Sequence, residues 1–207
     1  MNERHPDEHL VHASDERVRL VERTASHAVA LHAGRRRFSG FRWRSDLIVT
    51  ADEALPESGE AHVALDDDPS GERSEHIAHV VGRDASTDVA LLRVGDAAAR
   101  NDESSDDAAP DSAHPSALPD FSIDPVATGA TVLVIAAGEH GPVVAGGLVA
   151  SVGPEWRSLR GGRIDARVEL DVRLPRVAEG ALVVDARGAA LGMAVTGPRR
   201  RVLLIPG

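Results

Sequence analysis

The chain of 207 residues contains no cysteine, and only 2% of its residues are aromatic. The absence of cysteine excludes disulfides, thiolate catalysis and cysteine-ligated zinc or iron–sulfur sites. With so few aromatic side chains, the core must be built from Val, Leu, Ile and Ala. No window approaches the roughly 18 consecutive apolar residues that a membrane-spanning helix needs. We therefore expect a globular protein that is held together by its aliphatic core and has no membrane partner.

A concentrated basic surface is also missing. The formal net charge is −10, which argues against nucleic acid as a partner because phosphate binding needs clustered positive charge. The first residues, MNERHPDEHLVHASDER, are polar and mixed in charge, unlike a secretory signal, so we expect a cytoplasmic protein. The ten histidines are scattered, with close spacing only for His76 and His79 and for the group His5, His9 and His12. We interpret them as solvated side chains and predict no metal and no cofactor.

The hydrophobic pattern divides the chain into two β units. We expect a disordered tail over residues 1–13, then a short helix that begins near Ser14, whose side chain is a suitable N-cap. Short alternating runs follow up to residue 96, so residues 14–96 form the helix and a first barrel. Residues 97–125 are rich in Ala, Asp, Ser and Pro and predict an acidic flexible linker. Glycine-broken strand pairs fill residues 126–207, the second barrel. The pattern indicates an all-β protein of two barrels.

Four segments, in order, carry a family resemblance. They are SGFRWRSDLIVTADEAL (39–55), GRDASTDVALLRV (82–94), VLVIAAGEHG to GGLVASVG (132–153), and DVRLPRVAEGALVVDARGAALGM (171–193). Together they resemble the HtrA family of trypsin-like serine proteases. The resemblance implies the chymotrypsin fold, with two six-stranded antiparallel β-barrels. Relatives usually continue into a PDZ domain after the final Ile-Pro, whereas the sequence given stops at Gly207, so we expect no PDZ domain in it.

The resemblance aligns three carboxylates with the catalytic triad. Glu53 stands where the family has its histidine base, Asp88 matches the triad aspartate, and Glu179 stands at the nucleophile position. The oxyanion loop corresponds to Val177, where the family has glycine, with Glu179 and Gly180. A triad needs a hydroxyl, an imidazole and an orienting acid, and only the acid remains. The resemblance therefore implies a pseudoprotease, not an enzyme, with a protein-binding or regulatory role; its partner and oligomeric state stay open.

The same residues allow other interpretations. The aligned carboxylates, with Asp52 nearby, could instead bind a divalent cation or act as a carboxylate-pair hydrolase. The plain structural interpretation is that they point into water or pair with Arg42 or Arg176, and that Asp88 accepts backbone hydrogen bonds. An active hydrolase with a relocated site would have to use residues outside the motifs, such as Ser39, Ser45, His62 and His79. A decayed remnant without any role is the third hypothesis.

Overall fold

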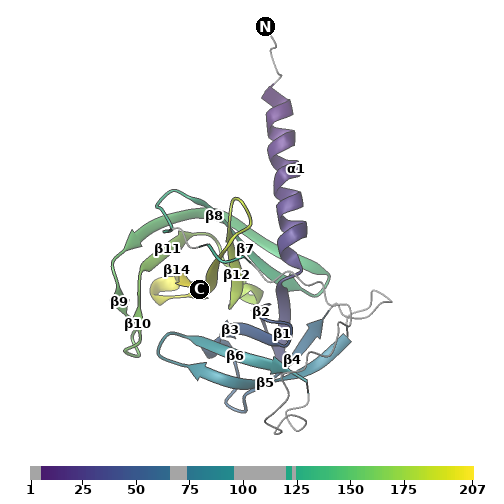
Figure 1. Cartoon of the computed structure of the whole chain (residues 1–207), viewed down its shortest axis with the longest axis vertical. Coiled ribbons are helices and arrows are strands. Elements are labelled where there is room, and N and C mark those ends of the chain that lie inside the picture. The colour runs from purple at the N-terminus through teal and green to yellow at the C-terminus, as the bar shows by residue number, and fades with distance from the viewer. Residues whose placement is uncertain (1–5, 66–73, 96–119, 123–124) are drawn as a thin grey trace, which may run out of the picture.

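The protein consists of two closed antiparallel β-barrels and one long helix (Figure 1). The computed structural model describes residues 6–65, 74–95, 120–122 and 125–207. The first barrel has the strand order β1-β2-β3-β6-β5-β4 and the second β11-β14-β13-β12-β7-β8. The all-β prediction of two six-stranded barrels is thus confirmed. The strands of the first barrel are β1 Ala28–Ala33, β2 Arg36–Arg42, β3 Leu47–Ala51, β4 Glu60–Leu65, β5 Ser74–Asp84 and β6 Val89–Val94.

The second barrel contains the remaining long strands, and a small two-stranded sheet, β9 and β10, extends from it. The described residues also form three short 3₁₀ turns. The bounds are β7 Thr131–Gly138, β8 Gly141–Gly153, β9 Trp156–Arg157, β10 Arg163–Ile164, β11 Arg167–Asp171, β12 Ala181–Asp185, β13 Ala190–Thr196 and β14 Val202–Pro206, with turns η1 Asp52–Ala54, η3 Arg176–Ala178 and η4 Pro198–Arg200.

The apolar pattern of each strand reflects its place between the barrels. Strand β4 alternates, with Val63 buried in the first barrel and His62 on the outer face, as expected for a strand with one wet side. The first four residues of strand β12, Ala181 to Val184, are apolar because both faces of the strand are buried there. Leu182 belongs to the apolar cluster that fills the first barrel and continues onto the outer surface of the second barrel. Val183 belongs to the separate cluster inside the second barrel. The two barrels are therefore joined by continuous apolar packing.

Helix α1 runs from Pro6 to Ala25 and is longer than the sequence analysis expected. Residues 6–13 are helical, not a disordered tail; residues 1–5 lie outside the described part. Proline is favoured at the first helical position because its missing N–H has no helical acceptor there, and this start signal precedes Ser14. The last turns are anchored by Leu20, which is 6% exposed and packs on Gly188, while the N-terminal half projects from the barrels (Figure 1).

Most of the predicted linker, residues 97–125, lies outside the described residues. Its later part, residues 120–122, is paired with the second barrel. Ala190 N–H donates to Asp120 O at 2.7 Å, and Ser122 N–H donates to Ala190 O at 2.8 Å. Phe121 packs against the shared core and lies 6.4 Å from Phe41, centroid to centroid. Of the helices in the described part of the chain, none has both the length and the apolar character to cross a bilayer.

Candidate functional site

Asp88 lies at the end of a tight turn that connects β5 to β6. Asp84 orders this turn, since its carboxylate accepts hydrogen bonds from the backbone N–H and hydroxyl of Ser86 and from the Thr87 hydroxyl. These hydroxyls hold the pKa of Asp84 below its usual range. Asp88 itself has φ of 62°, a left-handed conformation that Asp and Asn tolerate better than most residues. The turn thus fixes the backbone that presents the Asp88 carboxylate.

The Asp88 carboxylate binds the backbone of η1. Its Oδ1 accepts the Glu53 N–H at 2.8 Å, and Asp88 O accepts the Asp52 N–H at 3.3 Å. This is the backbone-acceptor role that the sequence analysis considered for Asp88. The Glu53 side chain forms an ion pair with Arg160, with 2.9 Å between Oε1 and Nη2. Asp52 is buried and lies 3.5 Å from Arg83 Nε.

The loop between β9 and β10 delivers Arg160 to this place. Arg160 also donates to Ala85 O at 3.3 Å, and the Ser158 hydroxyl donates to Ser86 O. A Cβ on Gly162 would lie 2.4 Å from Ser86 O, so only glycine permits this close approach. The sequence analysis considered Arg42 and Arg176 as partners of the carboxylates and missed Arg160, because no local pattern reveals a contact between loops of two barrels.

Glu179 is held by β13 and by the first barrel. Its carboxylate accepts the Thr196 N–H at 2.7 Å and the Thr196 hydroxyl at 2.6 Å, and its backbone O accepts the Ser39 N–H at 2.9 Å. Val177 lies in the preceding 3₁₀ turn, η3, and its carbonyl accepts the Ser39 hydroxyl at 2.7 Å. Gly180 follows with φ of 80°, and a Cβ there would lie 2.4 Å from Ser39 O.

The three carboxylates are near enough to influence one another. Burial raises the pKa of Asp88 to about 6, and the charges of Glu53, Glu179 and Asp52 add to the rise, against the hydrogen bond from Glu53 N–H. Even so, they do not form a compact cation site. Among the described residues, the group of three side chains whose metal-binding atoms lie within 4.8 Å of one another is His32, His62 and Glu75. This group lies on the outer face of the first barrel.

The residues considered for a relocated site are not assembled either. Ser39 is fully buried and, as described, donates its hydroxyl to Val177 O. Ser45 is exposed in the loop between β2 and β3. His62 and His79 lie on the outer face of β4 and β5, where they pair with Glu75 and Glu60. None of these side chains is hydrogen-bonded or ion-paired to Asp88 in the described contacts. The geometry brings together carboxylates and an arginine, not a nucleophile beside a base.

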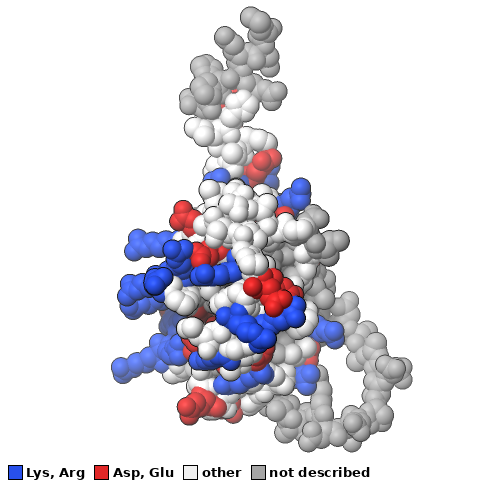
Figure 2. Space-filling view, turned by 90° about the vertical axis from the view of Figure 1, so that its left-hand side faces the viewer, with Lys and Arg blue, Asp and Glu red and all other residues white. Residues whose placement is uncertain are grey.

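Arginine side chains are spread over the face that carries β9 and β10 (Figure 2), despite the net charge of −10. The segment from β9 to η3 carries six exposed arginines, Arg157, Arg160, Arg163, Arg167, Arg173 and Arg176.

Comparisons with known proteins agree on the fold. A family model described as trypsin-like peptidase domain matches residues 38–193. The structure of Deg5 is similar, with a TM-score of 0.70 and 20% identity over 99% of this chain and 92% of that one. The Rv3671c protease of M. tuberculosis in its active form gives a TM-score of 0.68 and 18% identity, over 91% and 79% of the two chains. Its inactive form gives 0.67 and 19%, over 91% and 87%. A comparison with curated protein sequences found no match.

Proposed function

Since the chain belongs to the trypsin-like peptidase domain family, we propose that it is a member without peptidase activity that acts by binding another protein. The observation that carries the proposal is the side chain of Glu179. From the motif that the sequence resembles, we assign Glu179 to the nucleophile position, and its carboxylate accepts hydrogen bonds from both the N–H and the hydroxyl of Thr196. A carboxylate held here cannot serve as a serine-like nucleophile, and its negative charge would repel a developing oxyanion.

The position aligned with the histidine base supports the same conclusion. Glu53 is drawn into an ion pair with Arg160, and its own N–H is the donor to Asp88. In a working triad the acid orients an imidazole. Asp88 instead orders the backbone of η1, which is a structural task. Val177 adds to this, because a β-branched residue restricts the backbone conformations that a glycine at an oxyanion loop would allow.

A binding role is supported by the loop above the site. This loop between β9 and β10 is fixed by Ser158 and Arg160, yet it leaves Leu159 92% exposed. A rigid loop with an exposed leucine costs little conformational entropy when a partner covers it. Within this segment Arg160, Arg163 and Arg167 are ion-paired with carboxylates of the chain. The other exposed arginines, Arg157, Arg173 and Arg176, favour a partner with an acidic surface. We therefore propose a protein partner of acidic character for this face.

One alternative has a specific observation in its favour. A carboxyl with a pKa of about 6, such as Asp88, is suited to general acid–base catalysis near neutral pH. If Asp88 acted in this way with Glu53 or Glu179, the chain would be a hydrolase with a non-standard site.

Turnover of fluorescent casein separates these functions. The purified chain is compared with Asp88→Ala and with Asp165→Ala, an equivalent loss of a carboxylate at an exposed position. We expect no turnover above buffer from any of the three, together with cooperative melting of the parent chain. Turnover that Asp88→Ala abolishes and Asp165→Ala preserves would overturn the proposal and favour the hydrolase. A parent chain that does not melt cooperatively would favour a decayed remnant.

A further inference from the structure

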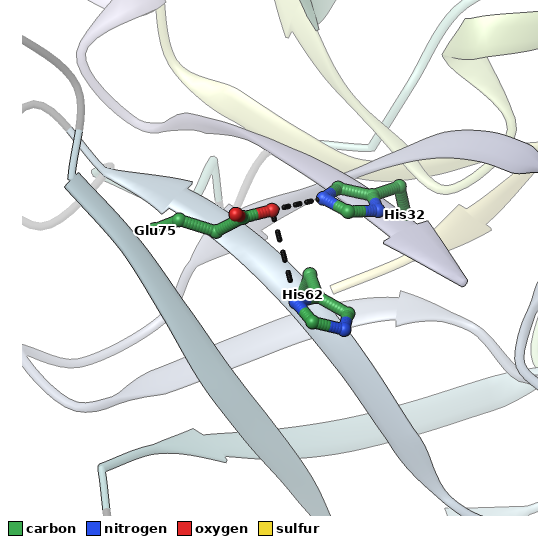
Figure 3. Close-up of side chains that lie close together, drawn as sticks. All are labelled: His32, His62 and Glu75. Atoms are coloured by element: carbon green, nitrogen blue, oxygen red, sulfur yellow. Dashed lines mark hydrogen bonds and ion pairs between the residues drawn. The ribbon is translucent and has the colours of Figure 1, made fainter. Parts of the chain in front are cut away.

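Three side chains that bind metals well gather on the outer face of the first barrel, far along the chain from one another. His32 comes from β1, His62 from β4 and Glu75 from β5 (Figure 3). His32 and His62 are direct cross-strand partners, and Glu75 is opposite Ala64, two residues from His62 on the same strand face. Because side chains alternate between the two faces of a strand, all three project to the same side.

The distances suit a single ion. His32 Nε2 lies 2.5 Å from Glu75 Oε1, and His62 Nδ1 lies 3.7 Å from the same oxygen. The two imidazoles stack with centroids 4.8 Å apart and an interplanar angle of 12°. Around a tetrahedral zinc with bonds of about 2.0–2.2 Å, ligand atoms are about 3.3 Å apart. The present separations bracket that value, and all three side chains are at least one-third exposed, so small rotations can reach it.

We propose that His32, His62 and Glu75 bind a divalent transition-metal ion of the Zn²⁺ type. Two imidazoles and one carboxylate are a ligand set that Zn²⁺ accepts, and they leave one position for water or for a side chain of a partner. A bound ion would connect three strands of the barrel, β1, β4 and β5. The proposal is independent of the proposed function, since none of these residues belongs to the site around Asp88.

The charges around the site permit a cation. The nearest basic side chain by strand register is Arg37, the cross-strand partner of His32. Its guanidinium is paired with Glu139, with 2.5 Å between Nη1 and Oε2, which offsets its repulsion of an ion. On the same outer face, Glu60 adds negative charge and pairs with His79 at 3.5 Å. That neighbouring pair offers two ligands where the proposed site offers three.

Calorimetric titration of the untagged full chain with ZnCl₂ tests the proposal. We expect one binding event of one-to-one stoichiometry, weakened about tenfold or more in His62→Asn and in Glu75→Gln, since loss of one of three ligands is at least as severe as loss of a second-shell contact. His79→Asn is the matched control on the same face and leaves binding unchanged. His12→Asn controls for helix α1, where His12 lies 3.1 Å from Glu16, and also leaves it unchanged.

A second measurement does not depend on the folding of any variant. In spectra of the ¹⁵N-labelled parent chain, equimolar Zn²⁺ should shift the imidazole nitrogens of His32 and His62 and leave those of His79 in place. Binding that survives both His62→Asn and Glu75→Gln, or that His12→Asn removes, would overturn the proposal. So would unchanged His32 and His62 resonances at saturating Zn²⁺.

Discussion

Replacement of Asp88 by asparagine should stabilise the protein at neutral pH, and replacement by alanine should destabilise it. Asparagine keeps an oxygen that can accept the Glu53 N–H, now at 2.8 Å from Oδ1, and it tolerates the φ of 62°. It removes only the charge. Alanine loses the hydrogen bond, worth about 1 kcal/mol, and adds roughly 1 kcal/mol of left-handed strain. The two variants thus separate the charge of Asp88 from its structural role.

The size of the charge effect follows from the pKa. The rise from the ordinary value of 3.8 to about 6 would correspond to at most about 3 kcal/mol, and partial exposure of the carboxyl reduces this to about 1–1.5 kcal/mol. Between these two pH values the folded chain holds a proton at Asp88 that the unfolded chain has released. Wild-type stability therefore falls as pH rises through this window, and the penalty is complete above about pH 6.

Urea unfolding followed by circular dichroism measures this effect. The free-energy difference between Asp88→Asn and the wild type should grow by about 0.5 kcal/mol from about pH 5 to about pH 8. The difference is the appropriate quantity because any contribution from His27, whose pKa is lowered by burial and by Arg42, is common to both proteins and cancels. A gain from asparagine that does not change with pH, or a loss equal to that of alanine, would refute the reasoning.

Two further predictions concern the segment at Glu179. Gly180→Ala should cost about 3 kcal/mol or prevent folding, because it combines positive-φ strain with a Cβ at 2.4 Å from Ser39 O. The control Gly34→Ala is also at positive φ but has nothing within 4 Å of the added Cβ, so it should cost only about 1 kcal/mol. Equal costs of the two substitutions in urea unfolding would contradict the importance of the contact with Ser39. Glu179→Ala should lose about 1–2 kcal/mol with its hydrogen bonds to Thr196, and should also lower the pKa of Asp88 by removing one of the charges that raise it. Carboxyl ¹³C titration by NMR would show this, and an unchanged pKa would mean that the two carboxylates do not interact.

The fold could be predicted from the sequence because each strand and turn leaves a local pattern in it. Alternation in EAHVAL and the apolar run ALVV distinguish a strand with one solvent-exposed face from a strand buried on both faces. Turn glycines such as Gly188 mark where strands reverse. The main local error was the start of the helix. The sequence analysis expected it near Ser14, a suitable N-cap, whereas the helix begins at Pro6.

The contacts between distant segments could not be predicted in the same way. Arg160 reaches Glu53 only because the loop between β9 and β10 crosses to the first barrel. His32, His62 and Glu75 meet only through the register of three strands. Spacing along the chain drew attention to His76 and His79 instead. Those two are an odd number of residues apart on β5, so they point to opposite faces of the sheet. Histidine spacing in a β protein is informative only once the strand pairing is known.

In the segment around Glu179, the backbone and the side chain have different structural tasks. Its backbone joins the two barrels, with Ser39 N–H donating to Glu179 O and the Ser39 hydroxyl donating to Val177 O. Gly180 presses against the same strand, and Thr50 donates its hydroxyl to Ser39 O. A substitution at Gly180 or Ser39 would disturb the junction between the barrels. The side chain of Glu179 instead accepts hydrogen bonds from Thr196, at the end of β13. Substitutions at Ser39 or Gly180 should therefore cost more stability than the loss of the Glu179 side chain, which removes about 1–2 kcal/mol of hydrogen bonding.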